Sequence, residues 1–150
     1  MSKLFQRLGS LSNSHVGFDF ELKAKRFFEI SGVNLHRNYE VEVGVGLIKK
    51  KHRFDLGSYE GKILVECKSH CWTSGNNVPS AKVTIWNEAM YYFYSSPDDY
   101  RKIMFVLKDK RSSTGETLAQ YYIRIYHHLI PTGVEFWEYD EEKFIAEQIY

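Results

Sequence analysis

The stretch RFDLGSYEGKILVECK, residues 53–68, predicts two short strands joined by a tight turn at Glu60 and Gly61. With those two residues as the loop, counting outward along both strands places Asp55 directly opposite Glu66. Side chains that face each other on antiparallel strands have Cβ atoms roughly 4.5–5.5 Å apart. Two carboxylates at that separation repel each other, so this register predicts a cation or a shared proton between them.

Strand alternation brings a lysine to the same face. Lys68 lies two residues beyond Glu66, whereas Cys67 points to the opposite face, where a buried thiol fits as a small hydrophobe. Two acids and a lysine on one face are typical of a divalent-metal site with an amine beside the attacking water, which predicts phosphodiester hydrolysis. The alternative is that Glu66 and Lys68 are solvent-facing partners on an edge strand. The prediction depends on the register, because a slip of one residue would separate Asp55 from both.

The composition indicates a single globular domain spanning residues 1–150. The chain contains 11 Tyr, 10 Phe and 3 Trp, an aromatic content that favours a packed core over disorder. Cys67 and Cys71 form no disulfide framework, which fits a reducing compartment. No apolar run is long enough to cross a bilayer, and the first eight residues lack the apolar core of a signal peptide. We therefore expect a cytoplasmic protein with no membrane partner.

Hydrophobic periodicity predicts an α/β fold, a mixed sheet flanked by helices. The predicted helices are residues 15–30, a helix capped by Ser80 that runs to Tyr94, residues 117–130, and a short terminal helix capped by Asp140. The predicted strands are residues 38–45, 53–57, 63–68, 102–107 and 134–139. Residues 121–126 taken alone also fit a strand, but the apolar spacing across 117–130 favours the helix.

The order of these elements resembles that of the PD-(D/E)xK nuclease superfamily, which includes restriction endonucleases and Holliday junction resolvases. The resemblance rests on Glu21 in the first helix, Asp55 on the first hairpin strand, and the Glu66-x-Lys68 pair on the second. It implies a restriction endonuclease-like fold. One departure is Phe54, which stands where the superfamily usually has a proline before the aspartate.

The resemblance implies a catalytic set of Glu21, Asp55, Glu66 and Lys68. In that assignment Asp55, Glu66 and the backbone carbonyl of Cys67 hold Mg²⁺, with Mn²⁺ as a substitute, and Glu21 completes the metal site directly or through water. Lys68 orients or deprotonates the attacking water, or stabilises the charge that develops on the phosphate; the sequence leaves these roles open.

Basic residues supply candidate contacts to DNA, although the net charge of +1 says little about partners. Directly before Asp55 the candidates are Lys49, Lys50, Lys51 and Arg53. Between predicted elements they are Lys110 and Arg111, and in the second helix the candidate is Lys82. The alternative for such runs is an ordinary solvated surface.

Three other interpretations remain open. Cys67, His70 and Cys71 suggest zinc, but the usual second pair of ligands is missing. Within the nucleases, a structure-specific junction resolvase is the main alternative to a restriction or DNA-processing endonuclease, because a chain this short has little room for a sequence-reading domain. A non-catalytic nucleic-acid-binding protein could use the same scaffold. Cleavage of both strands would favour a homodimer.

Overall fold

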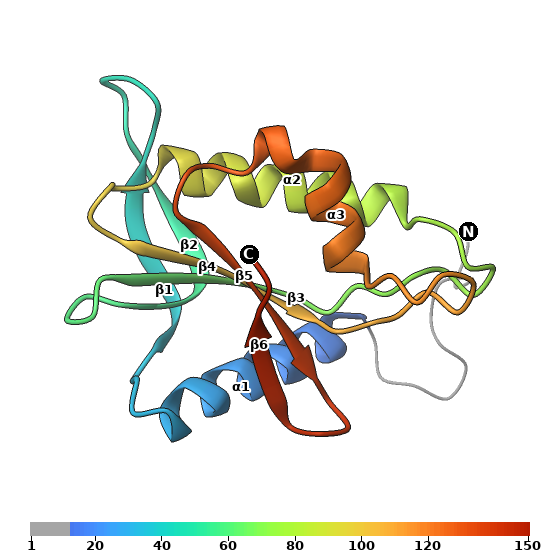
Figure 1. Ribbon diagram of the computed structural model, residues 1–150. Helices are drawn as coiled ribbons and strands as arrows, with labels where there is room; N and C mark the ends of the chain where they lie inside the picture. Colours follow the sequence, from blue (N-terminus) through green and yellow to red (C-terminus); the bar gives the residue numbers. More distant parts are fainter. Residues whose placement is uncertain (1–12) are drawn as a thin grey trace.

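The computed structural model describes residues 13–150 and contains, within that range, three α-helices and a six-stranded mixed sheet (Figure 1). The helices are α1 (Asn13–Ile30), α2 (Ser80–Ser95) and α3 (Leu118–Tyr126), the last continued by a short 3-10 helix, η2 (His127–Leu129). The strands are β1 (His36–Val43), β2 (Lys50–Ser58), β3 (Ile63–Lys68), β4 (Arg101–Leu107), β5 (Val134–Asp140) and β6 (Ile145–Gln148). The predicted α/β fold with a mixed sheet is confirmed.

The strands follow one another in sheet order from β1 to β6. Strands β1, β2 and β3 are antiparallel neighbours, β3, β4 and β5 run parallel, and β6 returns antiparallel to β5. The parallel strands are joined through α2 and α3, as parallel connections require. The carboxyl ends of β3 and β4 therefore meet at the same edge of the sheet.

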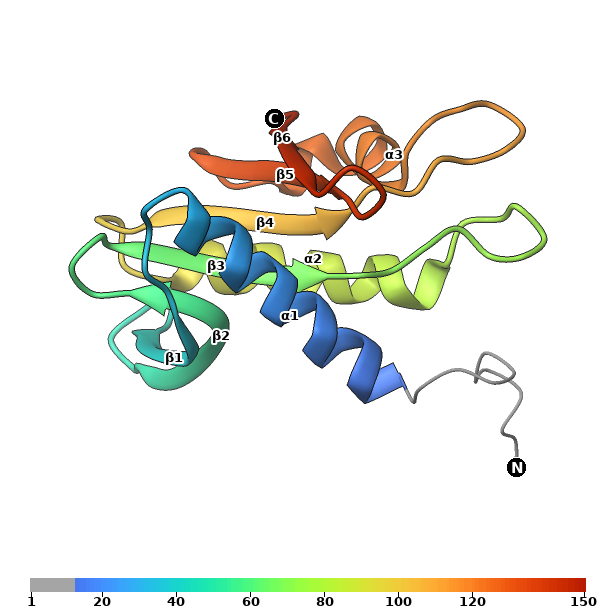
Figure 2. The same cartoon turned by 90° about the horizontal axis from the view of Figure 1, so that it is seen from below.

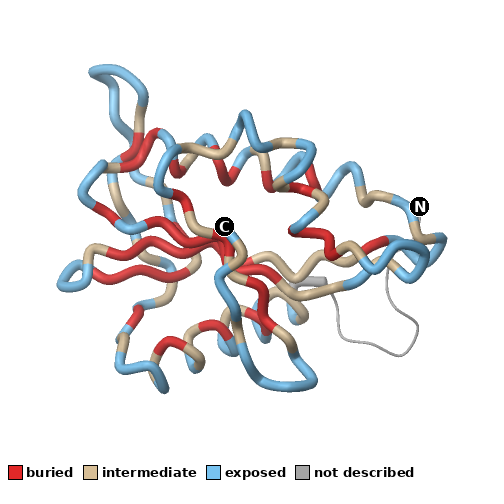
Figure 3. The backbone as a smooth tube through the Cα atoms, in the orientation of Figure 1, coloured by how far each residue is buried: buried red, intermediate tan, exposed pale blue. Residues whose placement is uncertain are grey.

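Helices cover both faces of the sheet, with α1 on one face and α2 and α3 on the other (Figures 1 and 2). The uninterrupted apolar run at the start of β3 contributes side chains to the hydrophobic layers on both faces of the sheet. Ile63 and Val65 pack beneath α1, and Leu64 packs beneath α2. The central strands are accordingly buried along most of their length (Figure 3). Such a run is typical of a strand that is covered on both faces, as this one is.

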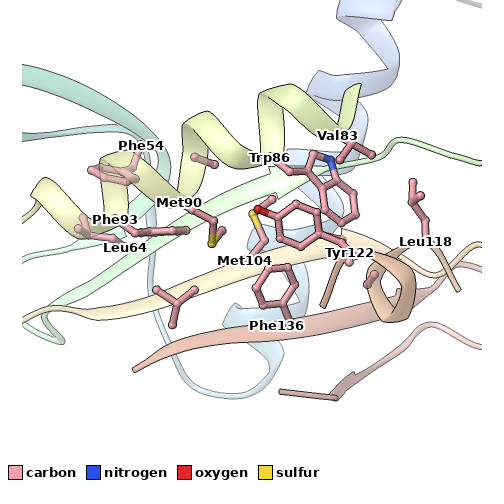
Figure 4. Close-up of a cluster of buried hydrophobic side chains, with 14 of the residues drawn as sticks. Phe54, Leu64, Val83, Trp86, Met90, Phe93, Met104, Leu118, Tyr122 and Phe136 are labelled. Carbon is pink, nitrogen blue, oxygen red and sulfur yellow. The ribbon is translucent and has the colours of Figure 1, made fainter. Parts of the chain in front are cut away.

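The layer beneath α2 and α3 is the more aromatic of the two (Figure 4). Trp86 and Phe93 point down from α2 toward the sheet and are fully buried. Tyr122 reaches across from α3, and its ring lies 5.2 Å from that of Trp86 and 5.6 Å from that of Phe136 on β5. This packing fixes α2 over the sheet and so fixes every α2 residue near the candidate site.

The first helix matches its predicted bounds within two residues. Phe20, Ala24 and Phe28 recur at helical spacing and are buried against the sheet. The helix ends where Gly32 adopts a φ of +82°, a left-handed conformation that glycine adopts without strain. The amide of Val33 then donates to the carbonyl of Phe28, which closes the helix end.

The predicted cap of α2 is wrong, whereas the predicted helix that begins near Thr117 is confirmed. Ser80 is the first helical residue of α2 and not its cap; Pro79 occupies the cap position, and no side chain caps this end. At α3, Thr117 and Gln120 form a reciprocal capping box, and the helix runs from Leu118 to Tyr126 with one 3-10 turn beyond it. The strand alternative is therefore wrong.

The predicted terminal helix is also wrong, because residues 145–148 form the edge strand β6. The Asp140 carboxylate accepts hydrogen bonds from the amides of Glu142 and Lys143, as a helix cap would, but here it stabilises a turn. Phe144, with a φ of +55°, then reverses the chain so that β6 pairs with β5. Separately, no helix within residues 13–150 combines the length and apolar content needed to cross a membrane.

Candidate active site

The predicted hairpin register is confirmed up to the point where the site begins. Strands β2 and β3 pair at Ser58–Ile63, Gly57–Leu64 and Leu56–Val65, and the ladder stops there. The expected Asp55–Glu66 pair is therefore not part of the ladder. Instead, Oδ2 of Asp55 accepts a hydrogen bond of 2.8 Å from the amide of Cys67. A carboxylate thus replaces a ladder hydrogen bond where the two strands separate.

Glu66 and Lys68 lie on the same face, as strand alternation predicts. Nζ of Lys68 lies 3.0 Å from Oε2 of Glu66, and the side chains are only 16% and 9% exposed. Burial alone would raise the pKa of Glu66, but His52 and Lys68 outweigh burial and hold that pKa below its ordinary value. This carboxylate is therefore ionised and paired. The alternative of a solvent-facing pair on an edge strand is wrong, because β3 lies between β2 and β4 and Glu66 is buried.

Asp55 is held where its charge is disfavoured. Burial raises the pKa of its carboxyl group to about 7, and the nearby charge of Glu66 adds to the effect. Lys68 and the amide of Cys67 oppose the shift, and Glu21 reinforces it. A carboxyl group whose pKa is raised by neighbouring carboxylates lies among oxygen donors and negative charge that a divalent cation would satisfy. By this test the residues fit a hard, oxygen-ligated metal ion.

Glu21 approaches from α1 and shares a cleft of about 450 Å³ with Asp55 and Lys68. The packing of α1 on the sheet places Glu21 at the edge of the layer, where its side chain remains 21% exposed. Nη2 of Arg37 donates to the Glu21 carboxylate over 2.9 Å. The structure thus brings the four predicted catalytic residues to one region, with Glu21 held by an ion pair.

The zinc interpretation finds no support in the geometry. The thiol of Cys67 is packed beneath α1, and burial raises its pKa. Nδ1 of His70 is already hydrogen-bonded to Trp86, and Sγ of Cys71 lies near the carbonyl of Ser69. Across residues 13–150, no three His, Cys, Asp or Glu side chains form a preformed metal cluster. A magnesium site built from two carboxylates, a backbone carbonyl and water does not require one.

Some of the predicted DNA contacts lie near the cleft. Lys82 lines it. The guanidinium of Arg111 lies 4.7 Å from the ring of Trp72, another cleft residue, and its Nε donates to the carbonyl of Asn76. Lys110 belongs to the same loop, where it pairs with Thr117. These three residues surround the carboxyl ends of β3 and β4.

The remaining basic candidates lie on the β1–β2 hairpin. The amide of Gly44 donates to the carbonyl of Ser95, which ties the start of the β1–β2 loop to the end of α2 remote from Lys82. Those two ends are about 20 Å apart along the helix. Lys49 donates to the carbonyl of Gly44, and Lys50 begins β2 opposite Val43. Lys51 and Arg53 both pair with Glu40. None of these four residues lines the cleft, although Arg53 lies two residues before Asp55.

His52 is not among the residues predicted from the sequence, but it lies beside Glu66. Its ring stacks on Tyr92 with centroids 3.6 Å apart, and its Nε2 lies 3.9 Å from Oε1 of Glu66. Among the described residues this buried nitrogen has no hydrogen-bond partner. Strand alternation alone would have put His52 on the α2 face with Phe54, but the stacking partner depends on tertiary packing.

The chain was also compared with family models, with curated protein sequences and with solved structures, and none of the three comparisons found a match.

Proposed function

We propose that this protein is a Mg²⁺-dependent nuclease that hydrolyses DNA phosphodiester bonds on a restriction endonuclease-like fold. The observation that carries the proposal is a half-buried Asp55 with a raised pKa beside the Glu66–Lys68 ion pair, at the point where β2 separates from β3. This arrangement is similar to the Asp and Glu-x-Lys residues of the PD-(D/E)xK nuclease superfamily, and Glu21 comes from the preceding helix.

Asp55 and Glu66, with the carbonyl of Cys67, would hold the metal. When bound, Mg²⁺ supplies positive charge at the phosphoryl oxygen and neutralises both carboxylates. Mn²⁺ would substitute, because it accepts the same oxygen donors. The hydrogen bond from the Cys67 amide fixes one oxygen of Asp55 and leaves the other available. The Arg37–Glu21 pair likewise holds the third carboxylate at the edge of the cleft.

Lys68 enters this mechanism as a cation. Burial lowers the pKa of its ammonium group, but the charges of Glu66 and Asp55 outweigh burial and keep that pKa above its ordinary value. A protonated lysine donates hydrogen bonds, so it orients the attacking water and stabilises the negative charge on the phosphoryl oxygens. We therefore favour the orienting and charge-stabilising roles of Lys68 over proton abstraction.

A non-catalytic nucleic-acid-binding protein is the less economical alternative. Binding a polyanion would not call for buried carboxylates, and the raised pKa of Asp55 indicates that its charge costs stability. A junction resolvase would be one form of the proposed nuclease. It differs from a restriction or DNA-processing enzyme in the DNA that is cut and not in the residues that cut it.

The test is a cleavage assay with purified protein and plasmid, linear or branched DNA in the presence of Mg²⁺ or Mn²⁺. The wild type should cut at least one of these substrates. Asp55→Ala and Lys68→Ala should each reduce cutting by at least about a hundredfold, because each removes a group that stabilises the transition state. Binding of DNA without metal should change far less in the Asp55 variant.

Lys143→Ala is the matched control, since Lys143 is exposed in the turn before β6. This variant should cut like the wild type. Equal cutting by wild type and Lys68→Ala across all substrates would contradict the proposal, as would absence of cutting by the wild type.

A further inference from the structure

The cleft that contains Asp55 and Lys68 also contains a histidine whose tautomer is fixed. Nδ1 of His70 lies 2.8 Å from Nε1 of Trp86. An indole N–H can only donate, so Nδ1 of His70 must accept, and the ring hydrogen of the neutral imidazole is on Nε2. Trp86 is fully buried and packs against Tyr122, so it holds the histidine from the core side.

The surroundings also keep the ring of His70 neutral. Burial lowers its pKa to about 4, and the positive charges of Lys68 and Lys82 act in the same direction. The acidic groups lining the cleft are Glu21 and Asp55. At neutral pH the ring is therefore an uncharged group that uses Nδ1 for Trp86 and keeps a hydrogen on Nε2.

Lys82 adds a positive charge at a position that helix stability does not explain. It lies in the first turn of α2, where the helix dipole disfavours cations and where Pro79 provides no side-chain cap. Both Pro79 and Lys82 line the cleft together with His70. An anion in the cleft would offset this unfavourable placement.

We propose that His70, Lys68 and Lys82 form a phosphate-binding subsite, in which the Nε2–H of His70 donates to a non-bridging phosphate oxygen. In the nuclease this phosphate is part of a DNA phosphodiester, and that identification rests on the proposed function. The two lysines supply positive charge. The neutral histidine supplies a hydrogen bond of fixed direction, because Trp86 holds its ring in one orientation. The cleft thus combines carboxylates for the metal with donors for the phosphate.

The first experiment observes the tautomer directly in two-bond ¹H–¹⁵N spectra of labelled wild-type protein between about pH 5.5 and 8.5. The His70 ring should carry its hydrogen on Nε2 throughout and should shift on addition of inorganic phosphate. A hydrogen on Nδ1, or a charged ring at about pH 6, would overturn the proposal. So would a ring that phosphate leaves unchanged.

The second experiment compares His70→Leu with His70→Gln in binding a short DNA duplex without divalent metal. Both variants delete the nitrogen that accepts from Trp86, but the amide oxygen of glutamine can accept in its place, so urea unfolding of each variant is measured alongside binding and only folded protein is compared. Only glutamine can return an N–H donor near the position of Nε2. His70→Leu should bind at least about tenfold more weakly than wild type, and His70→Gln within about threefold. Equal losses would show a structural role and overturn the proposal, and so would unchanged binding by His70→Leu.

The outcomes separate this subsite from the proposed function. A wild type that cuts DNA, with unchanged binding by His70→Leu, would overturn the subsite and leave the nuclease. A wild type that binds inorganic phosphate at His70 but cuts no DNA would overturn the nuclease and support the anion subsite.

Discussion

Asp55 lies where burial and the charge of Glu66 disfavour the ionised form of its carboxyl group. The pKa of its carboxyl group is raised to about 7 in the folded protein, first by burial and then by Glu66, against about 3.9 in an unfolded chain. Because the folded-state pKa is the higher one, the stability linked to this group is complete below about pH 4 and is lost as the pH rises through about 7. A group with this effect on stability is more readily explained by function than by folding.

Replacing this carboxylate with an amide should therefore stabilise the protein. Asp55→Asn should raise the free energy of unfolding at about pH 8 by roughly 1 to 4 kcal/mol, with the difference fading toward pH 4. Asparagine can still accept the hydrogen bond from the Cys67 amide. Urea unfolding at the two pH values measures the effect, and Asp19→Asn, at an exposed position on α1, is the control. An Asn variant no more stable than wild type at the higher pH would show that the charge is not disfavoured.

His52 should support Glu66 without touching the metal. His52→Phe keeps the ring that stacks on Tyr92 but removes the nitrogen beside Glu66. Mn²⁺ affinity, measured by calorimetry, should fall by about tenfold or more, as is usual when a partner of a metal ligand is lost. His36→Phe, at an exposed position on β1, should leave the affinity unchanged. Wild-type affinity in the His52 variant would exclude this supporting role.

The acidic residues of the site could be predicted from the sequence, but its histidines could not. Strand alternation relates Glu66 to Lys68, and the hairpin register brings Asp55 next to them although the ladder stops one residue earlier; both are local rules. The significance of His52 and His70 depends on Tyr92 and Trp86, which approach from α2 only after the chain has folded. No spacing along the chain signals such contacts.

Among the elements, segments with strong local signals were predicted accurately. Both bounds of β3 agree with those predicted from its apolar run, and α2 ends within one residue of its predicted end. Strand β6 was missed because it is four residues long, lies at the edge of the sheet and has no apolar alternation. Asp140 added to the error, because an Asp that accepts amide hydrogen bonds begins a turn as readily as a helix.

The capping box of α3 makes a prediction about stability. Thr117 accepts from the amide of Gln120 and also donates to the buried carboxylate of Glu138. Thr117→Ala should lower the free energy of unfolding by about 2–4 kcal/mol, because it removes the cap and leaves Glu138 without this donor. Thr117→Ser keeps both hydrogen bonds and should lose less than about 1 kcal/mol. Chemical denaturation distinguishes the two, and equal losses would mean that the hydroxyl contributes nothing.

At the scale of the whole molecule, the topology itself creates the site. Strand β2 pairs with β1 over most of its length but with β3 only near Ser58, so the sheet opens at Asp55. The cleft lies where β3 ends, beside the loop that follows β4, and ligands in open α/β sheets commonly bind at the carboxyl ends of strands. Lys82 and Arg111 reach this edge because α2 begins and the β4–α3 loop extends there.

Asp55 and Glu66 are proposed to bind a divalent metal ion where β2 and β3 separate. Anomalous diffraction from crystals soaked in Mn²⁺ would locate this ion. We predict one strong peak between the two carboxylates and within bonding distance of the Cys67 carbonyl, at about 2.0–2.4 Å from its oxygen ligands. No peak at this position, or a peak at His70 and Cys71 instead, would contradict the account.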